Sequence, residues 1–153
     1  MANTQAVANT FRTDMLNAKH AFGTTFTRAG TGADTFMGAL YYATATINAS
    51  TTAYTATGEV ANSGSYTAGG ISFGGFNAPA NTGAQAYTTP TASWTTGAAF
   101  SAAAFDCILM YNGTQAGNLA VAAFTFGSQT IVAGTFTLTM PANAAGTGLL
   151  QVN

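Results

Sequence analysis

The clearest pattern along the chain is the alternation of apolar and polar residues in FTFGSQTIVAGTFTLTM, residues 124–140. A period of two residues is typical of β-strands. We therefore predict two strands here, separated by a turn region near Gly127 to Gly134. One phase carries large apolar side chains, namely Phe124, Phe126, Phe136, Leu138 and Met140. The other phase carries hydroxyls and no charge, at Thr125, Thr135, Thr137 and Thr139.

Similar short apolar runs, separated by turn residues, follow through most of the chain. The run FDCILMYN (105–112) has large apolar residues on both phases, as expected of a strand that is covered on both faces. NGTQAGN (112–118) has the composition of a turn. The succession predicts a mainly β chain, an antiparallel β-sandwich or jelly roll. Its strands are expected at 34–42, 71–76, 105–112, 119–126, 134–140 and 149–152.

The N-terminal segment has a different period and predicts one short helix over residues 4–18. Val7, Phe11 and Met15 are spaced four residues apart, which places them on one helical face. This helix either packs on its own sheet or docks as an arm on a neighbouring subunit. We expect a single domain, with the helix and arm in 1–33 and the β-sandwich in 34–153. Residues 44–65 are compatible with a turn of helix or with a long ordered loop.

Charge is scarce, and this changes how the polar phases are interpreted. Three Lys or Arg and four Asp or Glu make up 5% of the chain, against about a quarter in typical domains. A net charge of −1 gives little repulsion between copies, so the chain either has a biased composition or lies against copies of itself or a larger assembly. The chain has no basic patch for nucleic acid and no long apolar run for a membrane span.

The residues that carry chemistry are too few for most active sites, so we expect no enzyme, no cofactor and no metal site. The single His20 and the single Cys107 exclude a His or Cys cluster for zinc. Cys107 is interpreted as a buried structural thiol, and His20 as solvated or bonded to backbone. Asp106 lies in an apolar strand and needs a partner, for which Arg12 or Arg28 is the candidate. Short threonine rows lack the repeating register of an ice-binding ladder.

Most of the chain resembles a family of small tailed-bacteriophage virion proteins. The order and spacing of the similar runs carry the resemblance: HAFGT (20–24), DTFMGALYYATATINASTTAYTATGEV (34–60), GSYTAGG (64–70), AFDCILMYNGT (104–114), LAVAAFTFGSQTIVAGTFTLTMP (119–141) and LLQV (149–152). The resemblance implies a capsid decoration or cement protein, made in the host cytoplasm and located on the capsid surface. It also implies a β-sandwich or jelly roll and no catalytic residues.

In that role the partners would be the major capsid protein and copies of the chain itself, as a homo-oligomer on the shell. The expected inter-subunit contacts are on the helix, the 44–65 segment and the threonine phase: Phe11, Arg12, Met15, Tyr54, Glu59, Thr135, Thr137 and Thr139. The alternative is a tail, fibre or head-surface module that recognises a host glycan or receptor. Its contacts would be exposed aromatic residues beside Asn112, unless they pack in the core: Tyr87, Trp94 and Tyr111.

Overall fold

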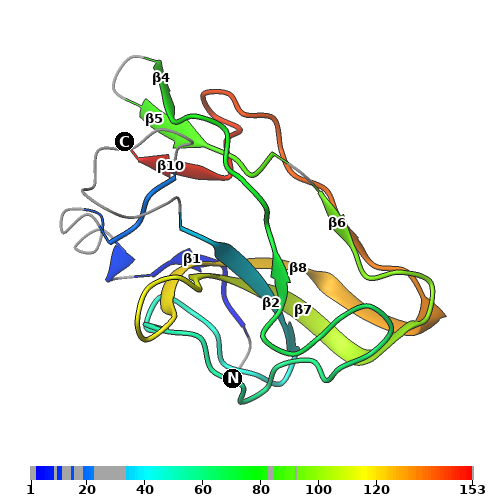
Figure 1. Cartoon of the computed structure of the whole chain (residues 1–153). Helices are drawn as coiled ribbons and strands as arrows, with labels where there is room; N and C mark the ends of the chain where they lie inside the picture. The colour runs from blue at the N-terminus through cyan, green and yellow to red at the C-terminus, as the bar shows by residue number, and fades with distance from the viewer. Residues whose placement is uncertain are drawn as a thin grey trace.

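The computed structural model describes residues 3–8, 10–11, 15, 19–22, 34–82, 85–91 and 93–152 (Figure 1). All strand pairs among them are antiparallel, so the prediction of a mainly β chain is confirmed. The strands are β1 (Ala6–Val7), β2 (Phe36–Tyr42), β3 (Ile71–Ser72), β4 (Ala80–Thr82), β5 (Gln85–Thr88), β6 (Trp94–Thr95), β7 (Phe100–Asn112), β8 (Leu119–Gly134), β9 (Thr137–Leu138) and β10 (Leu150–Val152).

A five-stranded sheet in the order β1-β8-β7-β2-β3 is the main body of the molecule (Figure 1). Its centre is a long hairpin of β7, with 13 residues, and β8, with 16 residues. The predicted turn at 112–118 connects these two strands. Gly117 (φ 87°) and Asn118 (φ 49°) take the left-handed backbone there, which glycine and asparagine tolerate best.

Strand β8 continues through the stretch where the sequence predicts a turn. It extends to Gly134, which still pairs with Phe100 of β7. The predicted turn at 127–134 is therefore wrong, and the chain leaves the sheet only after Gly134, which follows Ala133 (φ 47°). Register shifts along the hairpin accommodate the Gly-Ser-Gln run at 127–129 as β-bulges, so pairing with β7 overrides the local preference for a turn.

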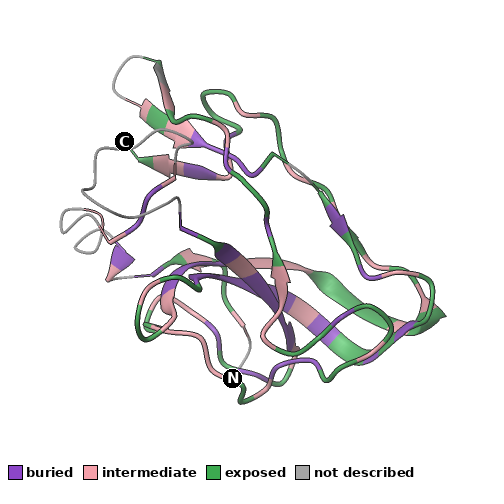
Figure 2. Ribbon diagram, in the orientation of Figure 1, coloured by how far each residue is buried: buried purple, intermediate pink, exposed green. Residues whose placement is uncertain are grey.

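Burial divides the hairpin into two halves. The inner half, residues 105–112 of β7 and 119–124 of β8, is largely inaccessible, and every residue from 107 to 112 is buried. The outer half, residues 100–104 and 125–134, is mostly exposed or half-exposed (Figure 2). The prediction that 105–112 is covered on both faces is confirmed. Because burial of apolar area is the main favourable term in folding, the inner half is the stabilising centre of the sheet.

The strands outside the main sheet form two smaller sheets, with the orders β10-β5-β4 and β6-β9. Figure 1 shows them above the five-stranded sheet. The described strands thus divide into sheets of five, three and two, and the expected sandwich or jelly roll is not confirmed.

The N-terminal segment begins as a strand, so the predicted helix over 4–18 is wrong at its start. Ala6 and Val7 form β1 and pair with Ala123 and Ala122 of β8. Helical backbone is found at Phe11 and Met15, while 12–14 and 16–18 lie outside the described residues. The paired edges of β1 and β8 satisfy each other's backbone donors and acceptors, and this gain outweighs the local preference for a helix that the spacing of apolar residues indicates.

The 44–65 segment is an ordered loop, one of the two possibilities that the sequence leaves open. Isolated bridges connect Glu59 to Tyr41 and Ala53 to Leu119, so the loop covers the inner half of the hairpin. Within the described residues, no helix has the length and apolar character needed to cross a bilayer.

Candidate functional site

The threonine face comprises Thr135, Thr137 and Thr139, and all three are exposed. The residues between them and after them, Phe136, Leu138 and Met140, are half-buried, so the alternation expected from the sequence is confirmed. β9 lies within this segment, and its pairing with β6 holds the segment in place.

Aromatic packing fixes which way the threonine face points. The Phe136 ring packs against Phe105 of β7 and Phe126 of β8, at centroid distances of 5.1 and 5.3 Å. The hydroxyl of Thr137 donates to that of Thr95 at 3.2 Å, and the hydroxyl of Thr95 donates to the Phe136 carbonyl at 3.1 Å. With Phe136 anchored inward, its neighbours on either side are held outward.

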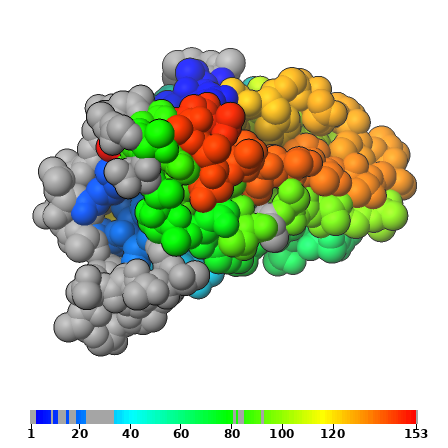
Figure 3. All heavy atoms as spheres, turned by 90° about the horizontal axis from the view of Figure 1, so that it is seen from above, coloured from blue at the N-terminus to red at the C-terminus, as the bar shows by residue number. Residues whose placement is uncertain are grey.

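A groove of about 410 Å³ lies between the outer half of β8 and the threonine face. In Figure 3 these two segments, in yellow to orange, form one end of the surface. The lining mixes apolar rings with hydroxyl and amide groups, which suits a surface that is neither charged nor fully apolar. The lining residues are Phe126, Gln129, Ile131, Thr135, Phe136, Thr137 and Leu138.

One of the expected contact residues, Glu59, belongs to the interior instead. Glu59 is 8% exposed, and its carboxylate accepts hydrogen bonds from Tyr54 Oη at 2.6 Å and Tyr66 Oη at 2.7 Å. The backbone N–H of Gly69 donates to the same carboxylate at 2.7 Å. The expectation of an inter-subunit contact at Glu59 is therefore corrected: a buried carboxylate with these partners closes the loop over the sheet.

The tyrosines around Glu59 are held in their neutral form. Burial, followed by the hydrogen bond to Glu59, raises the pKa of Tyr66 and of Tyr54 well above the ordinary value. The Tyr54 ring also stacks on Tyr111 of β7, with ring centroids 4.8 Å apart. Tyr54 is thus half-buried against the hairpin and contributes to the cover of its inner half.

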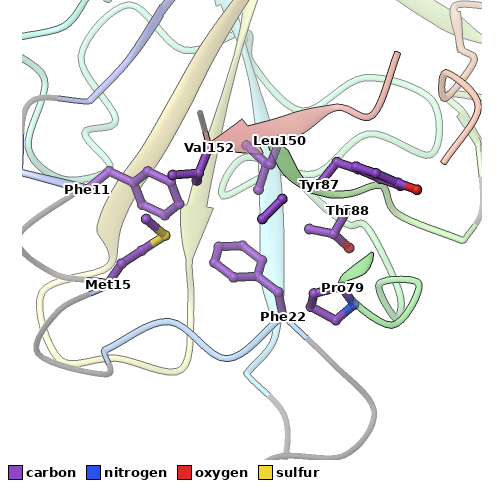
Figure 4. A pocket seen from close by; sticks show the side chains of 9 residues that line it. Phe11, Met15, Phe22, Pro79, Tyr87, Thr88, Leu150 and Val152 are labelled. Atoms are coloured by element: carbon purple, nitrogen blue, oxygen red, sulfur yellow. The ribbon is translucent and has the colours of Figure 1, made fainter. Parts of the chain in front are cut away.

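Phe11 and Met15 line a small apolar cavity of about 120 Å³ (Figure 4). Phe11 is buried and packs edge-on against Phe22 with centroids 5.7 Å apart, so it is a core residue rather than a surface contact. Met15 is half-buried in the cavity wall, and Arg12 lies outside the described residues. The other walls come from the N-terminal segment, the residue before β4, β5 and β10: Phe22, Pro79, Ala86, Tyr87, Thr88, Leu150 and Val152.

His20 is buried, which corrects the first of the two expectations, a solvated side chain, and leaves the second, a bond to backbone, as a prediction. Its Nδ1 lies 3.2 Å from the Asn112 amide, which also donates to the Asp34 carboxylate at 2.8 Å. The backbone N–H of Ala21 donates to the same carboxylate at 3.0 Å. These polar groups fasten the N-terminal segment to the end of β7, and only tertiary proximity reveals them.

Cys107 is buried in β7, as expected of a structural thiol. Burial, followed by the nearby Asp106 carboxylate, raises the pKa of Cys107 to about 12. The thiol is therefore protonated and unreactive at neutral pH. Asp106 accepts a hydrogen bond from the Asn3 amide at 2.6 Å, a partner that sequence reasoning missed. The expected partners Arg12 and Arg28 lie outside the described residues.

Two of the three aromatic residues proposed for glycan recognition are not exposed. Trp94 is 8% exposed and Tyr111 is 5% exposed, whereas Tyr87 is half-buried. Trp94 packs edge-on against Phe136, and Tyr111 stacks on Tyr54. The interpretation as core packing therefore holds for Trp94 and Tyr111.

Among the residues that the structure describes, no group of three or more His, Cys, Asp or Glu comes together as a potential metal site. No family model, no curated protein and no solved structure matches this chain.

Proposed function

We propose that this chain is a structural virion protein that binds the outside of a tailed-phage capsid and stabilises the shell by bridging neighbouring capsid subunits. The observation that carries the proposal is the exposed, uncharged threonine face and the groove beside it. The resemblance of the sequence to small tailed-phage virion proteins points in the same direction.

A neutral face suits a surface that becomes buried against a partner. Charged groups lose far more hydration free energy on burial than hydroxyls, which are satisfied by single hydrogen bonds. From Cys107 to Asn153 the chain has no Asp, Glu, Lys, Arg or His, so neither the threonine face nor the groove beside it would leave a charge unpaired. A net charge of −1 also lets many copies crowd on one lattice with little mutual repulsion.

Stabilisation of the shell would follow from mass action. A protein that binds the assembled lattice, and binds free capsid subunits weakly or not at all, lowers the free energy of the assembled state by its binding free energy. At a free concentration of 100 times the Kd, each bound copy contributes about 2.7 kcal/mol. Summed over many copies, modest single-site binding is sufficient.

The test compares purified shells with and without the protein as temperature or osmotic stress rises. Shells that carry the protein should break at a higher temperature. Thr137→Lys should abolish binding to the shells, because it places a charge in the buried contact. Thr57→Lys, on an exposed turn of the 44–65 loop, is the matched control and should bind normally. Equal breakage temperatures with and without the wild-type chain would refute the proposal.

A second candidate is a tail, fibre or head-surface module that recognises a host glycan. The groove favours this candidate because an aromatic ring, an amide and a hydroxyl line it together, those of Phe126, Gln129 and Thr135. Copy number in purified particles separates the two: hundreds of copies indicate decoration of the shell, whereas a few to a few dozen indicate a tail or fibre.

A further inference from the structure

The outer half of β8 is a long sheet edge. On one side β8 pairs with β7 along its whole length. On the other side β1 covers only the start of β8: Ala6 pairs with Ala123, and Ala8 N–H donates to the Val121 carbonyl at 3.1 Å. Beyond Ala123 no described strand pairs with this side of β8. Residues 125–134 therefore have no strand partner on this side, and the Gly127 carbonyl accepts a hydrogen bond from the Gln129 side-chain amide at 2.9 Å.

This edge has none of the side chains that usually prevent pairing with another chain. Natural sheets protect long edges with lysine, other charges, proline or β-bulges, and of these the edge of β8 has only the bulges near 127–129. Residues 119–134 contain no charged residue and no proline. Val132, at the exposed end of the edge, is 83% exposed, the highest value among the exposed large hydrophobic side chains.

The length of the edge indicates which strand fits it. The strands at the other edges of the three sheets are short: β1, β3, β6 and β9 have two residues each, and β4 and β10 have three each. Among the strands that the structure describes, only β8 of a second copy offers an edge of equal length. It also has the same bulges, and hence the same added twist. With no charge on either side, the pair encounters no electrostatic penalty.

We propose that two copies of this chain form a dimer by antiparallel pairing of the outer halves of β8 across a two-fold axis. Such an isologous contact uses the same edge on both partners, so it closes on itself and does not propagate into fibres. The two five-stranded sheets would then join into one continuous sheet. The dimer does not depend on the capsid role: it forms in solution from the chain alone.

Sedimentation equilibrium of the purified chain provides the first test. The wild-type protein should reach the mass of a dimer as concentration rises. Thr130→Lys and Val132→Lys place like charges across the two-fold axis, and each should raise the dimer dissociation constant at least about tenfold. Both positions are exposed, so the monomer fold should tolerate lysine. Thr57→Lys adds the same charge away from the edge and should dimerise like wild type.

Cysteine cross-linking and hydrogen exchange test the site without relying on the lysine variants. At least one of Ser128→Cys, Thr130→Cys and Val132→Cys should form a disulfide with its own copy, whereas Thr57→Cys should not. Amides of 125–134 should become protected as concentration rises. A wild-type chain that stays monomeric overturns the proposal, and so does a dimer that persists in both lysine variants. Neither result bears on binding to shells.

Discussion

The two halves of the β7–β8 hairpin share one backbone ladder but have opposite surroundings. In the inner half, β2 pairs along β7, β1 pairs with β8, and the 44–65 loop closes over the sheet through Tyr54 and Glu59. In the outer half, β8 is an open edge, and the polar faces of the segment that follows it are exposed. Strand formation alone therefore does not determine where stability lies. What covers a strand determines it, and the uncovered half is the one free to bind.

Phe105→Ala, at the boundary where the inner half meets the outer half, should have the largest effect on folding. The ring is 0% exposed and packs against Phe100, Phe126 and Phe136. Removing a buried phenylalanine ring costs about 3–5 kcal/mol, since it leaves a cavity as well as losing apolar burial. Urea unfolding followed by circular dichroism measures the loss. Phe105→Leu, which refills most of the volume, should cost less than half as much. A loss below about 1 kcal/mol for the alanine variant would show that this site is not tightly packed.

Glu59→Gln tests the polar closure of the inner half. The carboxylate accepts from two tyrosine hydroxyls and one backbone N–H, and an amide offers one acceptor oxygen and an unwanted donor. The free energy of unfolding should fall by about 1.5–3 kcal/mol. Tyr54→Phe removes a single donor at a half-buried position and should cost about 1 kcal/mol. Equal stability of Glu59→Gln and wild type would mean that the cluster does not hold the loop.

Alkaline pH should lower the free energy of unfolding more gradually, through the same tyrosines around Glu59. The folded pKa of Tyr66 is raised above the ordinary value of 10.0, mainly by burial, so its stabilising contribution is fully present below pH 10. As pH rises above 10 the unfolded tyrosine ionises first, and stability falls by up to about 1.4 kcal/mol per pH unit for each such tyrosine. Urea midpoints measured from about pH 8 to about pH 11 give the slope. Tyr66→Phe should make that slope shallower, and an unchanged slope would contradict the assignment to Tyr66.

Substitutions at exposed positions of the outer half and of the threonine face should have the smallest effect on folding. Val132→Thr and Thr139→Val change exposed side chains, so the free energy of unfolding should stay within about 0.5 kcal/mol of wild type. The measurement requires dilute protein, where self-association does not contribute. A loss above about 1 kcal/mol would show that these side chains are packed in the monomer, and would remove the contrast between the two halves.

The sequence predicts the features that depend on local alternation correctly, and it predicts those that depend on distant strands incorrectly. Period-two alternation correctly separated Phe136 and Leu138 from the exposed threonines, and the doubly apolar run at 105–112 correctly indicated a strand buried on both faces. The same reasoning predicted a turn within β8 and a helix where β1 forms. In both places a distant strand supplied hydrogen-bond partners that the local sequence does not reveal.

The functional residues show the same division. Exposure of the threonine face follows from its spacing in the chain, whereas the groove beside it exists because β8 continues past 127 and turns back after 134. The sequence predicts Glu59 as an inter-subunit contact. Burial among Tyr54, Tyr66 and Gly69 makes it a structural residue, a role that depends on contacts across the loop.

The sequence by itself determined a neutral, mainly β chain with one apolar and one threonine phase near its C-terminus, because side chains alternate on every strand whatever its partners. Only the tertiary structure decided which strands meet, how far β8 extends and which of its edges stays open. Those outcomes depend on pairing between residues far apart in the chain. The free energy that favours these pairings comes from backbone hydrogen bonds and buried apolar area that two segments form together. The sequence of either segment alone therefore does not reveal it.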